Sequence, residues 1–144
     1  MGKVRDILKS KGPTAIVFSV EPGIMVYKAI EQMSEKNIGG LLIVENGKLI
    51  GIFTERDYAR KLILKGKSSK ETPIGELMTK DPFTVSSDST IEDCMKLMSD
   101  KHIRHLPVVD GDKLTGVISI GDVVTQIIKD QKSVIEHLEQ YITQ

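Results

Sequence analysis

Two pairs of hydrogen-bonding side chains stand out in this 144-residue sequence because they recur with the same spacing. Thr54 precedes Asp57 by three residues, and Ser119 precedes Asp122 by three residues. A hydroxyl followed by a carboxylate at this spacing is typical of a helix start, where the hydroxyl caps free backbone N–H groups. The carboxylate can then accept further hydrogen bonds. No Ser/His/Asp or Cys/His set has a spacing that suggests nucleophilic catalysis, so we expect a binding protein rather than an enzyme.

Both pairs end a longer repeated segment. Residues 38–57 read IGGLLIVENGKLIGIFTERD, and residues 103–122 read IRHLPVVDGDKLTGVISIGD. The two copies align without a gap, and Gly51 falls on Gly116 as Asp57 falls on Asp122. A fixed period of this kind indicates a duplicated structural unit.

The hydrophobic pattern predicts the order β-α-β-β-α for each copy, with a short lead helix before it. In the first copy the pattern predicts strands at 15–20, 41–44 and 49–53, a helix over 26–33, and a second helix after Thr54 that buries Tyr58, Leu62 and Ile63. In the second copy it predicts a lead helix over 74–78, strands at 83–85, 106–109 and 114–119, a helix over 91–98 that buries Met95, and a last helix from Asp122.

The chain therefore divides into four predicted parts. They are a first repeat with its N-terminal helix (1–66), a polar linker (67–73), a second repeat (74–129) and a C-terminal helical extension (130–144). The last helix has no Gly or Pro from Val123 onward and keeps apolar residues at spacings of three and four. Such a stripe needs a surface to cover it, and we expect a second chain there.

Composition narrows the possible partners. Twenty basic and twenty acidic side chains cancel, so nothing favours nucleic acid or an anionic membrane as a partner. No apolar run approaches the ~18 residues of a membrane span. The single cysteine, Cys94, rules out an internal disulfide and a cysteine metal cluster. We expect a cytoplasmic protein without a metal or catalytic cofactor.

The repeated Gly-x-x-[Ser/Thr]-x-x-Asp ending and the Leu106-Pro107-Val108-Val109 segment resemble the cystathionine-β-synthase (CBS) domain. The resemblance covers roughly residues 3–130, so the chain is similar to a stand-alone CBS pair. It implies an α+β fold in which two repeats pack through their sheets with pseudo-two-fold symmetry. It also implies a homodimer that binds AMP, ADP or ATP between its repeats and signals to a regulated protein, which the sequence does not identify. S-adenosylmethionine or NAD(H) are alternative ligands.

The resemblance also implies roles for individual residues. Asp57 and Asp122 would accept hydrogen bonds from ribose hydroxyls, with Thr54 and Ser119 beside them. Adenine would lie among apolar and backbone groups, for which the candidates are Val20, Ile38, Gly40, Val85, Ile103 and Pro107. Arg56, Arg104 and His105 are the candidate phosphate ligands.

The two sites are not equivalent, because Gly39-Gly40 in the first copy align with Arg104-His105 in the second. We therefore expect the Asp122 site to bind better, although close ligand approach over the glycines would reverse that order. The alternative to ligand binding is a structural or protein-interaction pair. Its carboxylates would only start helices, its arginines would be surface charges and His105 would be a packed core residue.

Overall fold

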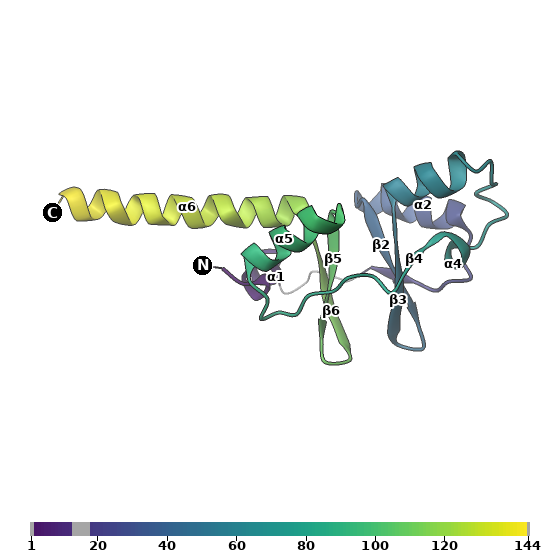
Figure 1. Ribbon diagram of the computed structural model, residues 1–144, viewed down its shortest axis with the longest axis horizontal. Helices are drawn as coiled ribbons and strands as arrows, with labels where there is room; N and C mark the ends of the chain where they lie inside the picture. Colours follow the sequence, from purple (N-terminus) through teal and green to yellow (C-terminus); the bar gives the residue numbers. More distant parts are fainter. Residues whose placement is uncertain (1, 13–17, 144) are drawn as a thin grey trace. The chain divides into compact units, whose positions relative to one another are not determined.

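The computed structural model describes residues 2–12 and 18–143, which form two compact units (Figure 1). The first-repeat unit consists of β1 (Ser19–Val20), α2 (Val26–Lys36), β2 (Gly40–Glu45), β3 (Lys48–Thr54), α3 (Glu55–Asp57), η1 (Tyr58–Ile63), α4 (Ile74–Leu77) and β4 (Thr79–Lys80). The second-repeat unit consists of α1 (Val4–Ser10), α5 (Ile91–Lys101), β5 (His105–Asp110), β6 (Lys113–Ser119) from Thr115 onward, and α6 (Ile120–Thr143). The predicted α+β class and the long C-terminal helix are confirmed.

The first-repeat unit is built on a four-stranded sheet in the order β1-β2-β3-β4. β1 runs parallel to β2, and β2 and β3 form the predicted hairpin. Asn46 and Gly47 both take positive φ (52° and 76°), which suits the tight turn that the sequence predicts. Of the predicted strand 15–20 the structure describes residues 18–20, of which Ser19–Val20 pair in the sheet, and residues 15–17 lie outside the described residues.

The second-repeat unit has a two-stranded sheet, β5-β6. The predicted strand over 83–85 is wrong, because only Val85 pairs, as an isolated parallel bridge to Val108. Val85 N donates to Pro107 O at 3.0 Å, and Val109 N donates to Val85 O at 2.8 Å. Asp81 takes positive φ and Pro82 has no amide proton, so the chain turns before a ladder can extend to the exposed Phe83.

Each unit has its own apolar core. In the first-repeat unit the core is centred on the fully buried side chains of Leu41, Ile43, Phe53, Leu62 and Ile74. In the second-repeat unit the buried residues include Leu106, Val108, Ile118, Val123 and Cys94. Burial, together with the charge of Asp93, raises the pKa of the Cys94 thiol to about 11, which agrees with its predicted role as a small core residue.

Two residues that the sequence predicts to be buried on helices are exposed, so these predictions are wrong. Ile63 is 55% exposed, because η1 is π-helical: Leu64 N donates to Ala59 O, five residues back. This wider winding keeps Leu62 in the core and turns Ile63 outward. Met95 is 44% exposed, since the buried stripe of α5 lies along Ile91, Cys94 and Met98.

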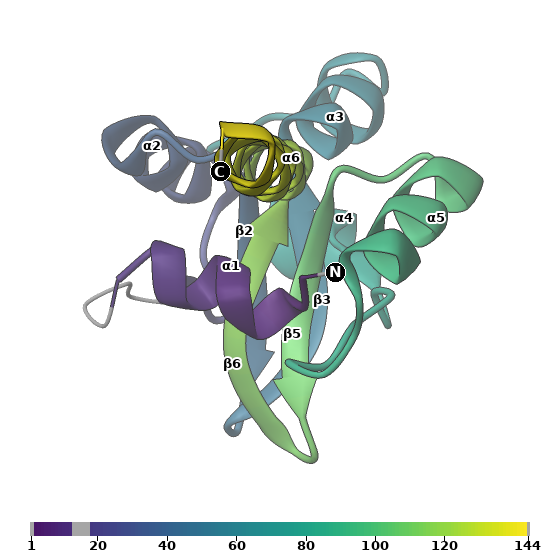
Figure 2. The same cartoon turned by 90° about the vertical axis from the view of Figure 1, so that its left-hand side faces the viewer.

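The lead helices are exchanged between the repeats. α1 precedes the first repeat in the sequence but belongs to the second-repeat unit, and α4 packs in the first-repeat unit. Val4 and Ile74, at the starts of α1 and α4, are both fully buried. Figure 2 shows α1 crossing β6 of its own unit. The spatial units thus differ from the parts predicted along the chain, whose boundaries stay a prediction.

The predicted linker, residues 67–73, lies against the start of α2. Ser69 O accepts from Tyr27 N and Thr72 O accepts from Val26 N, both at 2.9 Å. Helix starts leave N–H groups without intrahelical acceptors, and these carbonyls supply them. Thr72 is accordingly only 7% exposed. Among the described residues, no helix has the length and apolarity needed to cross a bilayer.

The repeated glycines are the contact points for the exchanged helices. A Cβ at Gly51 would lie 2.5 Å from Met78 Sδ and 3.0 Å from Thr79 O. A Cβ at Gly116 would lie 2.8 Å from Leu8 Cδ2, with its next neighbours at 3.7 Å or more. Glycine therefore recurs in both copies because the strand packs closely against the residue after the last buried residue of its lead helix. This residue is Met78, after Leu77, at Gly51 and Leu8, after Ile7, at Gly116.

Gly51→Ala should lower the free energy of unfolding by about 1–3 kcal/mol, since both a side chain and a backbone carbonyl must shift. Gly116→Ala should cost less, because only the end of the Leu8 side chain has to move. Gly23→Ala is the matched control: its Cβ would meet nothing within 4 Å, so we expect a change within about 0.5 kcal/mol. Urea unfolding measures all three. Equal stability of the Gly51 and Gly23 variants would contradict the packing argument.

Candidate functional site

The Thr54–Asp57 pair forms a reciprocal cap where β3 runs into α3. Asp57 N donates to Thr54 Oγ1 at 3.2 Å, and Thr54 N donates to Asp57 Oδ2 at 3.0 Å. Thr54 has extended backbone angles, as a residue preceding a helix should. The predicted N-cap is confirmed, and the return bond from the carboxylate makes it a capping box.

The Ser119–Asp122 pair repeats this arrangement where β6 runs into α6. Asp122 N donates to Ser119 Oγ at 3.1 Å, and Ser119 N donates to Asp122 Oδ2 at 2.9 Å. In each unit, therefore, one carboxylate oxygen is held in place by the backbone of the residue three positions earlier. The capping geometry sets the direction of both aspartates at the strand end.

The two carboxylates differ in how much hydrogen-bonding capacity remains. Asp57 Oδ2 also accepts from Thr54 Oγ1, and its Oδ1 accepts from Thr79 Oγ1 at 3.3 Å and pairs with Lys61 Nζ at 3.2 Å. The residue is only 8% exposed.

Asp122 keeps one oxygen available. Its Oδ2 takes both the Ser119 N–H and Lys11 Nζ, the latter at 2.8 Å. No donor in residues 2–12 or 18–143 reaches Oδ1 within hydrogen-bonding distance, and the side chain is 24% exposed. Asp122 can therefore accept a further hydrogen bond from a ligand, whereas Asp57 is already saturated by its own unit.

The pKa of Asp122 is lowered from its ordinary value. Burial of the carboxyl works in the opposite direction and raises the pKa. The hydrogen bond from Lys11, the bonds from Ser119 and the charge of Lys11 together outweigh that effect. Asp122 is therefore an anion at neutral pH, suited to hydroxyl donors.

Lysines at both carboxylates were missed by the sequence analysis. Lys61 Nζ reaches Asp57 from one helical turn away and also donates to Leu77 O at 3.1 Å. Lys11 Nζ reaches Asp122 from the end of α1 and also donates to Val117 O at 3.0 Å. The i,i+4 spacing of Asp57 and Lys61 could have revealed the first pair. Lys11 lies 111 positions from Asp122, and no local pattern reveals it.

The predicted loop residues lie beside the caps in their own units. Gly39 O accepts from Glu55 N at 3.1 Å, and at the aligned position Arg104 O accepts from Ile120 N at 2.9 Å. Gly40 pairs with Thr54 in the β2–β3 ladder. The structure thus brings the loop at 103–105 next to Ser119–Asp122, and the loop at 38–40 next to Thr54–Asp57.

The remaining predicted ligand residues occupy two kinds of environment. Arg56 and Arg104 are exposed, and His105 is half-buried. The apolar candidates lie in or against the cores: Val20, Ile38, Val85, Ile103 and Pro107. Val85 and Pro107 are joined by a backbone hydrogen bond, whereas Val20 pairs with Ile43, inside the first-repeat sheet. Whether these residues contact a ligand stays a prediction.

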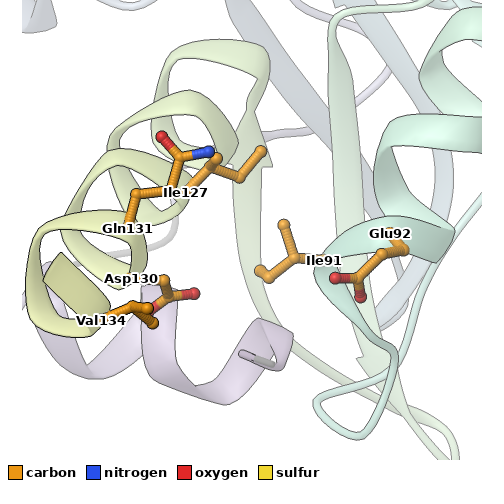
Figure 3. Close-up of a pocket in the computed structure, with 6 residues that line it drawn as sticks. All are labelled: Ile91, Glu92, Ile127, Asp130, Gln131 and Val134. Carbon is orange, nitrogen blue, oxygen red and sulfur yellow. The ribbon is translucent and has the colours of Figure 1, made fainter. Parts of the chain in front are cut away.

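A pocket in the second-repeat unit lies away from the cap. It is lined by Ile91 and Glu92 of α5 and by Ile127, Asp130, Gln131 and Val134 of α6 (Figure 3). Its charged groups are both carboxylates, so it offers no cation to a phosphate. None of its residues was a predicted ligand contact. In the part of the chain that the structure describes, no cluster of three or more His, Cys, Asp or Glu could hold a metal ion.

Comparison with known proteins gives consistent matches. A model of the CBS domain matches residues 4–64 and 74–129. The chain is 38% identical to the mitochondrial CBS domain-containing protein CBSX3 of Arabidopsis thaliana, covering 96% of this chain and 71% of that protein.

Two solved structures extend the match. A putative signal-transduction protein with CBS domains from Burkholderia ambifaria has a TM-score of 0.86 and 46% identity, over 90% of this chain and 96% of that one. The CBS domain pair of protein MJ0100, solved with 5′-methylthioadenosine and S-adenosyl-L-methionine, has a TM-score of 0.76 and 26% identity, over 91% and 98%.

Lys11→Met should reduce stability at neutral pH and reduce it less in acid. The folded-state pKa of Asp122 lies below the unfolded value of about 3.9, so its stabilising contribution is present above that pH and is lost as pH falls through the folded pKa. Without Lys11 that contribution shrinks. The difference from the parent protein should therefore be constant above about pH 5 and shrink toward pH 2, where only the loss of the bond from Lys11 to Val117 O remains, measured by urea unfolding across that range.

Lys9→Met is the matched control, because Lys9 lies in the last turn of the same helix and is exposed. It should remove the same favourable helix-end charge without touching Asp122. If both variants lost stability with the same pH dependence, the Lys11–Asp122 contact would not be the cause.

Proposed function

Because the chain belongs to the CBS-domain family, with two repeats that match its model, we propose that it is a regulatory module that binds an adenosine nucleotide. The proposed ligand is AMP, ADP or ATP, and the proposed output is a change in contact with a regulated protein. The role is non-enzymatic. The observation that carries the proposal is the capping box at Asp122, which leaves Oδ1 available beside a lysine and the 103–105 loop.

A ribose carries two neighbouring hydroxyls, and a helix-start carboxylate can accept from both. Hydrogen bonds to a charged acceptor contribute about 1.5–3 kcal/mol each. The MJ0100 pair was solved with two ligands that share adenosine, which supports this ligand class for a relative of the same architecture. Ser119 would hold the carboxylate and the helix start in place while the ribose binds.

The choice of an anionic nucleotide over S-adenosylmethionine depends on charge. Lys11 lies 2.8 Å from Asp122, and Arg104 and His105 belong to the loop whose carbonyl caps the same helix. A lysine at the carboxylate and basic residues on the capping loop favour a ligand that brings phosphate. S-adenosylmethionine carries a sulfonium cation instead, and it would meet repulsion at this position.

The first-repeat carboxylate suits a different role. Asp57 has partners on both oxygens within its own unit and is nearly buried. We therefore propose one principal site, at Asp122, and a mainly structural role for Thr54–Asp57. If both carboxylates proved to be structural, the chain would be a protein-interaction pair.

The proposal also includes a homodimer and a cytoplasmic location. A sensor of this kind transmits occupancy only when the ligand prefers one of two states, and a homodimer contact is the proposed two-state element. A cytoplasmic location stays a prediction, and the name of the Arabidopsis relative places that protein in mitochondria.

A thermal-shift panel with AMP, ADP, ATP, S-adenosylmethionine and NADH tests the ligand class. Ligand at a hundred times its dissociation constant stabilises by about 2.7 kcal/mol, which should raise the unfolding midpoint by several degrees. We expect shifts with the adenine nucleotides and the smallest shift with S-adenosylmethionine. Flat curves with every compound would contradict nucleotide sensing and favour the protein-interaction pair.

Asp122→Ala should abolish most of the AMP-induced shift, and Asp57→Ala should leave most of it. Both variants keep the N-cap hydroxyl and lose the same return bond from the N-cap N–H to the carboxylate, so each is the control for the other. The shift must be measured against each variant's own ligand-free midpoint. A larger loss in the Asp57 variant would refute the proposed order of the sites.

A further inference from the structure

The C-terminal part of α6 has no counterpart in the first repeat. η1 ends at Ile63, which aligns with Ile128, whereas α6 continues to Thr143. Every residue from 131 to 140 is exposed, and Figure 1 shows α6 running past α1 and α5 of its own unit. A lone helix segment of this length is marginal in water, so its apolar face needs a partner.

That apolar face differs from the face that α6 uses within its unit. Val123 is fully buried and Ile127 packs partly against the core. An exposed stripe alternates in steps of four and three residues, and it consists of Val124, Ile128, Gln131, Ile135, Leu138 and Ile142. Each residue turns the helix by about 100°, so this stripe lies about a quarter turn from the packed face. Steps of four and three are the repeat of a two-helix coiled coil.

Only the later part of the stripe belongs to the tail. Ile128 is 50% exposed, and its aligned residue Ile63 is 55% exposed, so this position is open in both repeats. Ile135, Leu138 and Ile142 are 54%, 56% and 79% exposed and have no aligned residue in the first repeat. The tail therefore carries its own apolar surface, which the repeats do not explain.

We propose that a second copy of this chain covers the tail, with the two α6 tails packed antiparallel. In this register Ile135 packs against Leu138 of the second copy, and Gln131 packs against Ile142 of the second copy. Two-fold symmetry repeats both contacts, as an interface between identical surfaces requires.

The charged side chains beside the stripe favour the antiparallel orientation over the parallel one. Lys132 and Glu139 lie seven residues apart on the same flank of the stripe. The antiparallel register places Lys132 of each copy opposite Glu139 of the other, which gives two ion pairs. A parallel pair would instead set Lys132 beside Ile127 and Glu139 beside Val134, without ion pairing. The alternative is that a helix from a different protein covers the tail, but nothing would require its charges to match this self-complementary pattern.

The proposal is independent of nucleotide binding and can be tested on the full chain by sedimentation equilibrium. Lys132→Glu alone and Glu139→Lys alone should each weaken self-association about tenfold or more, because two ion pairs become two repulsions. The double variant should recover the parent association. An equimolar mixture of the two single variants should associate more tightly than either one alone, because the mixed pair is complementary at both contacts.

The matched control changes the same charges farther around the helix from the stripe. Lys129 and Glu136 are also seven residues apart and exposed, but they lie away from the stripe. Lys129→Glu and Glu136→Lys should leave association unchanged. Single Lys132 or Glu139 variants that associate like the parent, or a mixture no tighter than its components, would overturn the antiparallel pairing. A parent chain that stays monomeric at all concentrations would overturn the contact itself.

Discussion

The capping box at the end of each repeat is the interaction on which the site depends. A hydroxyl at the N-cap and a carboxylate three residues later satisfy each other's backbone N–H groups, which fixes where the strand ends and the helix begins. The same bonds consume part of the capacity of each carboxylate. What the aspartate can offer to a ligand is therefore decided by its other neighbours. Lys61 and Thr79 occupy the second carboxylate oxygen of Asp57, whereas Lys11 binds the already bonded oxygen of Asp122 and leaves the other available.

Two of those neighbours, Thr79 and Lys11, follow the exchanged lead helices, whereas Lys61 lies on η1. Each sheet receives a short helix from the segment before the other repeat, and Gly51 and Gly116 are the places where the strand admits it. Thr79 follows α4, and Lys11 follows α1. A chain cut between the repeats would separate each unit from a helix that its core contains. Because of this exchange, we expect neither repeat to fold without the other, since each core needs contacts between residues far apart in the sequence.

Much of the fold could be predicted from the sequence, because repeated local patterns specify local structure. The turn at Asn46-Gly47, the caps at Thr54 and Ser119, the stripe of α2 and, except for Met95, the stripe of α5 follow from spacing alone. The failures have a common cause. Tertiary contacts set the winding of η1 that exposes Ile63, the absence of a strand before Val85 and the position of Lys11 beside Asp122. The aligned copies identify the aspartates but not the number of bonds that each one already makes.

The position of Lys11 would connect the proposed ligand site to the proposed contact between copies. Its ammonium joins the carboxylate of α6 to the end of α1, and it also holds Val117 O on β6. A hydroxyl ligand bound as proposed would share this carboxylate with Lys11, while its phosphate would offer the lysine a second anion. Binding would then redistribute the bonds of one lysine among α1, β6 and the ligand. Since α1 packs on the sheet and on α6, which continues into the tail, occupancy at Asp122 would act on the element that the proposed second copy would contact.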